Sequence, residues 1–262
     1  YLLDNNYPYS EINNSEKFIF NEELDLTDKF VENNIVPREH QLDVLNVVVK
    51  NDRGIVRSCT GSGKTQMVAM CAAKFNAPTI VYVIGLDLLD QFYKLFSKLF
   101  DEEIGYIGDG ICNIKRINIA SIWTIGRALK IPDKDMVTDD ELSSDEKDIS
   151  LSQRDSILKM LSDTKVHFFD ESHVISTKTA TQIYKSINPI KIFGFSGTPF
   201  RDDASNLLIN AILGEQIINV SASSLIEKGF LAQPIIKFVT VPKMTVGGQY
   251  LSVYKDYIVE NE

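Results

Sequence analysis

Residues 55–65 of this 262-residue chain read IVRSCTGSGKT, and this stretch is the strongest indication of the fold. The apolar pair Ile55 and Val56 predicts a short strand, and a glycine-rich turn separates it from the helix-favouring segment Gln66 to Phe75. A phosphate-binding loop requires this order of strand, turn and helix. Glycines let backbone N–H groups face phosphate oxygens, and the helix that follows offers its positive N-terminus. The stretch therefore predicts a nucleotide-binding loop.

The residue types in this loop suit the chemistry of a bound triphosphate. The Lys64 ammonium would reach the β- and γ-phosphates, and the Thr65 hydroxyl would ligate Mg²⁺. The strict pattern has a glycine where this chain has Ser58, so the loop departs from it at one position. A chance turn is the alternative, which the flanking strand and helix disfavour. The residues predicted to bind the nucleotide here are Thr60, Gly61, Ser62, Gly63, Lys64 and Thr65.

Outward from the loop, predicted strands and helices alternate along the chain. Apolar residues at helical spacing predict helices over residues 42–49, 66–75 and 86–100. Apolar, β-branched runs predict buried strands over 79–84, 117–122, 166–169 and 192–195. Strands separated by helices imply βαβ crossovers. The predicted fold class is therefore α/β, a mostly parallel sheet with helices on both faces.

A second candidate site follows the strand predicted at 166–169. Residues 165–173 read KVHFFDESH, an apolar run that ends in two adjacent carboxylates. At the carboxyl end of a parallel strand, Asp170 would hold Mg²⁺ and Glu171 would polarise the water that attacks the γ-phosphate. Such a pair is by itself more often a solvated one. Together with the phosphate loop, it predicts a catalytic role for Lys64, Asp170 and Glu171.

Composition places the chain among ordinary globular proteins, with 44% hydrophobic and 24% charged residues. No apolar run approaches the roughly 20 residues of a membrane-spanning helix. The three cysteines lack CxxC spacing, which indicates neither a disulfide framework nor a zinc site and fits a reducing compartment. The three histidines lie too far apart to indicate a metal cluster, and a structural role is expected for His167. The opening at Tyr1, without a leader, is typical of a fragment of an intracellular protein.

The formal net charge of −9 argues against a polyanionic partner. The excess is local, because residues 133–148 hold eight acidic side chains against Lys134 and Lys147, a net −6, which leaves −9 + 6 = −3 elsewhere. We expect a solvated acidic insertion at the surface over residues 131–148, with an acidic interaction segment as the alternative. The objection to a nucleic-acid partner is therefore weakened, though not removed.

Three motifs occur in a characteristic order: TGSGKT at 60–65, DESH at 170–173 and SGTP at 196–199. In this order they resemble the motor motifs of the superfamily 2 DExH helicases. The resemblance implies a RecA-like P-loop NTPase domain that hydrolyses ATP with Mg²⁺. It also implies that Ser196 and Thr198 link nucleotide state to the grip on nucleic acid, together with His173. SGTPFR and residues 224–231 look most like the branch that holds excision-repair, phage recombination and restriction-motor helicases.

Two further segments are similar to helicase elements, each with a structural alternative. Residues 38–41, REHQ, resemble the adenine-recognition element, in which Gln41 would bond the base and Arg38 would lie nearby. A plain helix start is the alternative there. Residues 83–91 and 119–122 resemble segments that contact the nucleic-acid backbone, and they fit equally well as core strand followed by helix.

The resemblance implies a division of the chain and a function. Residues 1–35 would be a lead-in or accessory remnant, 36–234 the ATP-binding domain, and 235–262 a linker or the start of a second RecA-like domain. The arginine fingers of such motors come from that second domain, so we expect weak hydrolysis by this chain alone. The predicted function is an intracellular helicase or translocase, cytoplasmic or at the nucleoid, acting on DNA or RNA, with DNA favoured. The alternatives are a silent nucleotide-sensing docking subunit and another P-loop NTPase or kinase.

Overall fold

The computed structural model describes residues 20, 26–131, 150–171, 178–199 and 206–238. The chain divides into two compact units, Tyr1–Leu231 and Ala232–Glu262. In the second unit, residues 232–238 are described, and they form neither helix nor strand. The acidic residues 133–148 and His173 lie outside the described residues.

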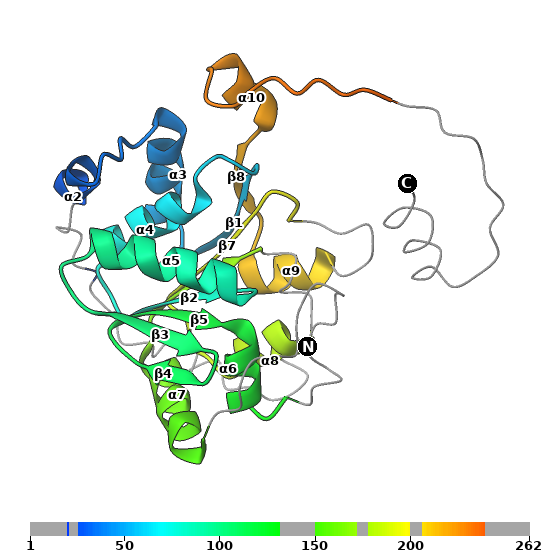
Figure 1. Cartoon of the computed structure of the whole chain (residues 1–262). Helices are drawn as coiled ribbons and strands as arrows, with labels where there is room; N and C mark the ends of the chain where they lie inside the picture. Colours follow the sequence, from blue (N-terminus) through cyan, green and yellow to red (C-terminus); the bar gives the residue numbers. More distant parts are fainter. Residues whose placement is uncertain (1–19, 21–25, 132–149, 172–177, 200–205, 239–262) are drawn as a thin grey trace, which may run out of the picture. The chain divides into compact units, whose positions relative to one another are not determined.

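The first unit is built on an eight-stranded sheet in the order β4-β3-β5-β2-β6-β7-β1-β8 (Figure 1). The pair β3 and β4 is antiparallel and every other neighbouring pair is parallel. The strands are β1 (Arg53–Ser58), β2 (Thr79–Val83), β3 (Ile104–Gly108), β4 (Ile111–Asn113), β5 (Ile117–Ser121), β6 (Val166–Asp170), β7 (Lys191–Ser196) and β8 (Gln216–Val220). The predicted strands are confirmed, and β3, β4 and β8 were not predicted.

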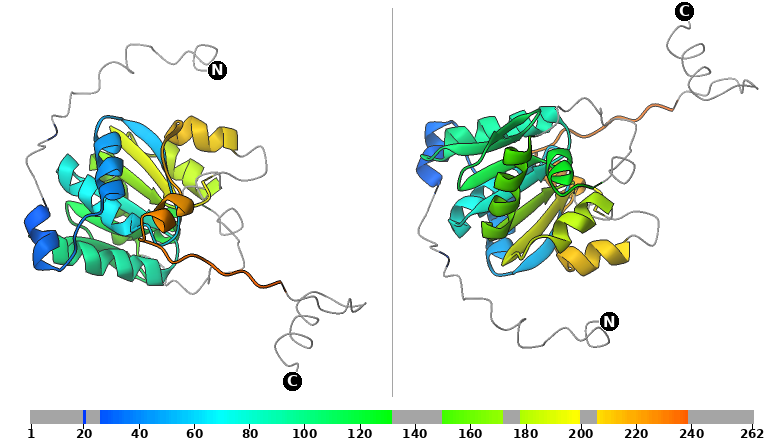
Figure 2. Two further views of the ribbon diagram at one scale, coloured as in Figure 1. Left: turned by 90° about the horizontal axis from the view of Figure 1, so that it is seen from above. Right: turned by 90° about the horizontal axis from the view of Figure 1, so that it is seen from below.

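Helices cover both faces of this sheet, as Figures 1 and 2 show. Helices α2 to α5 and α10 supply side chains to one core, and α6 to α9 supply the other. The predicted α/β fold with a mostly parallel sheet is therefore confirmed. The described helices are α2 (Thr27–Glu32), α3 (Glu39–Val49), α4 (Lys64–Phe75), α5 (Leu86–Leu99), α6 (Ile122–Ala128), α7 (Leu151–Asp163), α8 (Lys178–Lys185), α9 (Asn206–Leu213) and α10 (Ala222–Glu227).

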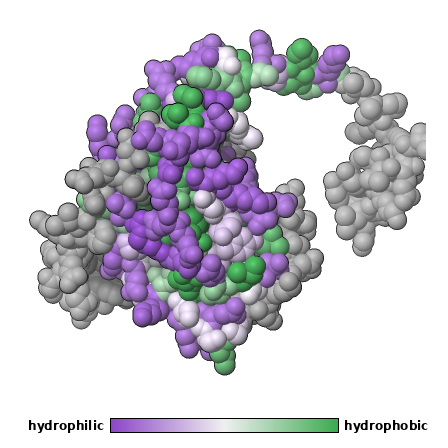
Figure 3. Space-filling model, turned by 60° about the vertical axis from the view of Figure 1, so that its left-hand side comes forward, coloured by the Kyte–Doolittle hydropathy of each residue, from purple (hydrophilic) through white to green (hydrophobic). Residues whose placement is uncertain are grey.

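The larger core forms where α4 and α5 pack on the central strands. Phe75 of α4 stacks on Phe193 with ring centroids 5.9 Å apart, and Phe168 lies 6.0 Å from Phe193. Helix α5 buries Leu89, Phe92, Phe96 and Leu99, the three-and-four spacing of an amphipathic helix. On the face shown in Figure 3, hydrophilic side chains predominate and apolar ones lie in separate groups. In the described ranges, every helix is too short or too polar to span a bilayer.

His167 of β6 lies fully buried in the middle of the sheet, where a structural role was expected. Its Nδ1 atom lies 3.0 Å from the Tyr82 hydroxyl of β2. The Tyr82 ring in turn stacks on Phe169, with centroids 4.3 Å apart. Burial lowers the pKa of His167 from 6.5 to about 3, because the charged imidazolium would lose its hydration in this core.

We expect this histidine to make the fold less stable in acid. Between pH 6.5 and about 3, the unfolded chain holds a proton on residue 167 that the folded chain excludes. The free energy of unfolding therefore rises with pH in this window, by up to about 1.4 kcal/mol per pH unit from this group. His167→Gln keeps a neutral partner for Tyr82 but does not titrate. Urea unfolding at about pH 5 and about pH 7 should show that the free energy of unfolding falls more in acid for the parent chain than for the variant. An equal decrease in both would contradict a buried, neutral His167.

Candidate active site

The loops that carry the predicted motifs lie at one edge of the sheet, because β6, β7 and β1 are neighbours and run parallel. Phe195 of β7 pairs with Val56 of β1 on one side and with Asp170 of β6 on the other. The carboxyl ends of the three strands are therefore level with one another. The loops that follow them meet beyond this edge, where parallel α/β sheets place their ligand sites.

The predicted phosphate loop turns back into α4 through two glycines with left-handed backbone. Gly61 has φ of 82° and Gly63 has φ of 87°, a region that side chains with a Cβ atom rarely adopt. Gly63 is the N-cap of α4, which starts at Lys64 and runs for 12 residues. A Cβ atom at Gly63 would also overlap the Nε2 atom of Gln41. The loop conformation therefore depends on glycine at these two positions.

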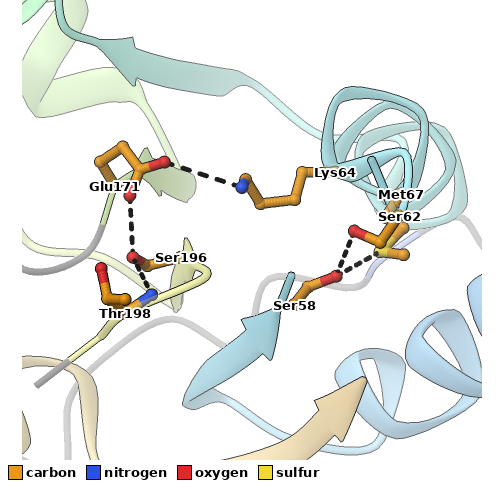
Figure 4. Close-up of polar contacts among 7 residues, drawn as sticks. All are labelled: Ser58, Ser62, Lys64, Met67, Glu171, Ser196 and Thr198. Atoms are coloured by element: carbon orange, nitrogen blue, oxygen red, sulfur yellow. Dashed lines mark hydrogen bonds and ion pairs between the residues drawn. The ribbon is translucent and has the colours of Figure 1, made fainter. Parts of the chain in front are cut away.

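Ser58, the departure from the strict loop pattern, is fully buried below the turn. Its hydroxyl oxygen lies 2.6 Å from that of Ser62 and donates to the Met67 sulfur at 3.9 Å (Figure 4). The serine thus links the end of β1 to the top of the loop and to α4. The sequence predicted no contact between the Ser58 and Ser62 hydroxyls. It indicated only that Ser58 stands where the strict loop pattern has a glycine.

Four of the predicted residues form a chain of polar contacts across the edge of the sheet (Figure 4). The Lys64 ammonium lies 3.6 Å from Oε1 of Glu171. The Ser196 hydroxyl donates to Oε2 of Glu171 at 2.8 Å, and the Thr198 backbone N–H donates to the Ser196 oxygen at 3.2 Å. Glu171 has φ of 57°, the left-handed region that a non-glycine residue adopts at a cost of about 1–3 kcal/mol. Three separate motifs thus meet at the Glu171 carboxylate.

The two residues predicted to hold a metal lie at the same edge. Asp170 is the last residue of β6 and is only 7% exposed, and Thr65 is partly buried in the first turn of α4. Their donors are a carboxylate and a hydroxyl, the oxygen ligands that Mg²⁺ prefers. The chemistry of this donor pair therefore fits Mg²⁺. The predicted nucleotide-binding residues Thr60 and Gly61 are exposed at the top of the turn.

Gln41 and His40 of α3 both contact the Ser62 carbonyl of the loop. The Gln41 amide nitrogen donates to the Ser62 carbonyl at 3.2 Å and to the Gln66 side-chain oxygen at 2.9 Å. The Gln41 amide oxygen accepts from the Arg38 backbone N–H at 2.9 Å. Both amide protons of this buried side chain are thus engaged, and its contact with a base stays a prediction. The His40 Nε2 atom lies 3.0 Å from the Ser62 carbonyl oxygen, a contact that the sequence did not indicate.

Residues 228–231, which follow α10, also lie against this end of α3. The Lys228 ammonium bonds Oε2 of Glu39 at 2.9 Å, which holds the pKa of the Glu39 carboxyl below its ordinary value. Leu231 lies beside Gly61 of the loop, so closely that a Cβ atom on that glycine would be 2.8 Å from it. No sequence pattern predicts this contact, because the two segments are far apart in the chain.

Comparisons with known proteins concern the family and the fold of the chain. Residues 34–201 match the protein family described as "Type III restriction enzyme, res subunit". A curated relative, the DNA 3'-5' translocase XPB2 of Sulfurisphaera tokodaii, is 23% identical over 207 residues, 79% of this chain and 40% of that protein. The chain thus spans less than half of that relative's length.

Two solved structures have a similar fold. The helicase domain of Hef from Pyrococcus furiosus matches with a TM-score of 0.53 and 18% identity, over 73% of this chain and 38% of that one. The UvsW helicase from bacteriophage T4 matches with a TM-score of 0.53 and 19% identity, over 75% of this chain and 68% of that one. At these identities the likeness concerns the fold, and the predicted RecA-like fold is confirmed.

Proposed function

The chain belongs to the family described as "Type III restriction enzyme, res subunit", among the superfamily 2 helicases, and from this premise we propose that it is the ATP-binding half of a DNA motor. The motor would hydrolyse Mg-ATP to move on DNA or to remodel it. The observation that carries the proposal is the contact at 3.6 Å between the Lys64 ammonium and the Glu171 carboxylate. It joins the phosphate loop to the acidic pair in one site.

The side chains of this site suit hydrolysis of a triphosphate. Lys64 would turn from Glu171 to the phosphate oxygens, and the N–H groups of the loop would bind the same anion. Glu171, held by Ser196, would then orient the attacking water and accept its proton. Thr65 and Asp170 would hold Mg²⁺, which when bound neutralises charge on the phosphates. The domain would extend over residues 36–234, and the arginine fingers would come from a second RecA-like domain.

The proposed polymer is DNA, because the curated relative is described as a DNA translocase. The loops after β2 and β5 lie at the same carboxyl edge as the site and would contact the DNA backbone. The protein would act inside the cell, in the cytoplasm or at the nucleoid. The test is ATP hydrolysis by the full-length protein with and without duplex or single-stranded DNA. Binding of ATP without any turnover on DNA would instead favour a docking subunit.

Ser196→Ala tests the proposed coupling of nucleotide and DNA. The change removes a hydroxyl that donates to the Glu171 carboxylate and accepts from the Thr198 N–H. A hydrogen bond to a charged group contributes about 1.5–3 kcal/mol, so we expect DNA-stimulated hydrolysis to fall about tenfold or more. The Kd for ATP should stay within about twofold. Ser162→Ala, in the exposed face of α7, is the matched control, and equal DNA stimulation in both variants would argue against coupling through Ser196.

A further inference from the structure

The short segment after α10, residues 228–231, is here called the strap. Gly229, with φ of 73°, turns the chain at the end of α10, and the backbone N–H groups of Phe230 and Leu231 then donate to the Leu225 carbonyl at 2.8 and 3.2 Å. Leu225 itself is fully buried in the larger core. The strap is therefore anchored through Leu225 to the core of the domain.

Two side chains of the strap contact the start of α3. The Lys228 ammonium bonds Oε2 of Glu39 at 2.9 Å, and the Arg38 guanidinium carbon lies 4.9 Å from the centroid of the Phe230 ring. Both side chains of the strap are exposed, so these contacts lie at the surface. They hold the strap along the helix whose next residues contact the phosphate loop.

Leu231 is the strap residue that reaches the phosphate loop. Of residues 227–238, all of which the structure describes, it alone is partly buried, and it packs against the larger core. A Cβ atom on Gly61 would lie 2.8 Å from Cδ2 of Leu231. Among the described residues beyond the two chain neighbours of Gly61, this methyl carbon is the only heavy atom within 4 Å of that position. One side of Gly61 is therefore covered by Leu231 alone.

Gly61 has few other restraints on its conformation. The next residue, Ser62, is held at its carbonyl by hydrogen bonds from His40 and Gln41. The backbone groups of Gly61 form no hydrogen bond within the part of the chain that the structure describes. Glycine adopts positive and negative φ about equally readily, so the φ of 82° at Gly61 is one of several accessible conformations. The packing of Leu231 supplies a restraint that hydrogen bonds do not.

We propose that Leu231 is a positioning residue of the phosphate site, an inference that rests on the proposed ATP function. Its side chain keeps Gly61 in the left-handed conformation, so that less conformational freedom is lost when the N–H groups of the loop bind a triphosphate. By linkage, a triphosphate on the loop holds the strap in place by the same factor by which the strap raises the affinity for the triphosphate. The chain passes from Leu231 directly into the second compact unit, residues 232–262, so nucleotide binding restrains the residue that precedes that unit.

The first test measures the binding of Mg-ATP and of Mg-tripolyphosphate, which has no base, to the 262-residue chain. Leu231→Ala should raise both Kd values by the same factor, about five- to tenfold, because the freedom of one more backbone residue is then lost on binding. Leu231→Met, which keeps an apolar side chain of similar volume, should bind both ligands within about twofold of the parent chain. Ile235→Ala is the matched control, because Ile235 is an aliphatic residue four positions further on that is 86% exposed, and it should change neither Kd.

The second test measures hydrogen exchange of the Phe230 amide, which is protected in the strap by its bond to the Leu225 carbonyl. Saturating Mg-tripolyphosphate should slow this exchange about five- to tenfold in the parent chain, the same factor by which Leu231→Ala weakens binding. In Leu231→Ala the ligand should slow the exchange by less than about twofold. A leucine that only stabilised the fold would leave the exchange of this amide independent of the ligand in both proteins.

The outcomes separate this inference from the proposed function. If neither ligand binds the parent chain, the proposed function fails and the inference fails with it. If both ligands bind, and Leu231→Ala binds them as the parent chain does, the inference is wrong while the phosphate site stands. A higher Kd for ATP alone would mean that Leu231 acts on the base and not on the loop. Equal weakening in Leu231→Met and Leu231→Ala would overturn side-chain packing as the cause, and a Phe230 amide whose exchange does not respond to the ligand would overturn the coupling.

Discussion

Glu171→Gln is expected to lower kcat for ATP hydrolysis by about 10²- to 10⁴-fold, the usual contribution of a general base. The amide is nearly isosteric and still accepts the Ser196 hydrogen bond, but it takes no proton from water. The Kd for ATP should change by less than about threefold, because the binding groups on the loop remain. The measurement is steady-state hydrolysis by the full-length protein at saturating DNA, together with equilibrium ATP binding.

The matched control for this variant is Glu103→Gln. Glu103 is an exposed carboxylate that pairs with Lys115 and directly precedes β3, at the amino end of that strand and thus at the edge of the sheet away from the site. Its loss should leave both kcat and the Kd for ATP within about twofold of the parent values. If Glu171→Gln kept more than half of the parent kcat for ATP hydrolysis, Glu171 would not be the general base, and another residue would have to take that role.

Lys64→Ala is expected to raise the Kd for Mg-ATP about 100-fold, which corresponds to about 2.8 kcal/mol. The Lys64 side chain is 16% exposed and belongs to the first residue of α4, where its ammonium would bond the phosphate oxygens directly. Isothermal titration of the chain with Mg-ATP measures the change. Lys74→Ala, in the last turn of the same helix, is the control and should bind ATP as the parent chain does.

Loss of binding in Lys64→Ala should not come from unfolding. The ion pair between Lys64 and Glu171 is partly exposed, with 16% and 30% of the two side chains accessible, so solvent screens it and its removal costs about 1 kcal/mol at most. Urea unfolding of the variant should confirm this. ATP affinity equal to that of the parent chain would contradict the phosphate-loop assignment and, with it, the proposed function.

The two variants together separate the motor from a docking subunit. In a motor, Lys64→Ala loses binding, and Glu171→Gln keeps binding but loses turnover. In a docking subunit, Lys64→Ala also loses binding, but the parent protein has no DNA-stimulated turnover for Glu171→Gln to remove. The alternative of another P-loop NTPase or kinase would show turnover that DNA does not stimulate.

The central strands and helices were predictable because their signals are local. Residues 79–83 of β2 are all buried, and this run of apolar and β-branched residues is what a strand covered on both faces requires. The apolar stripe of α5 recurs at helical spacing for the same reason. Strands β3 and β8 were missed because their patterns are weak. β3 contains Gly105 and Gly108, and β8, at the edge of the sheet, buries fully only Val220.

Local sequence patterns were sufficient to predict the α/β class, the glycine-rich turn before α4 and the residue types that the proposed chemistry needs. They were sufficient because periodicity and glycine conformation depend on neighbouring residues. Only the tertiary structure brings the Glu171 carboxylate into contact with both Lys64 and Ser196. It likewise shows that the Gln41 amide donates to the Ser62 carbonyl and that the Arg38 guanidinium lies over the Phe230 ring. Contacts between segments so far apart in the chain arise from the packing of the whole sheet and its helices, which no short stretch of sequence encodes.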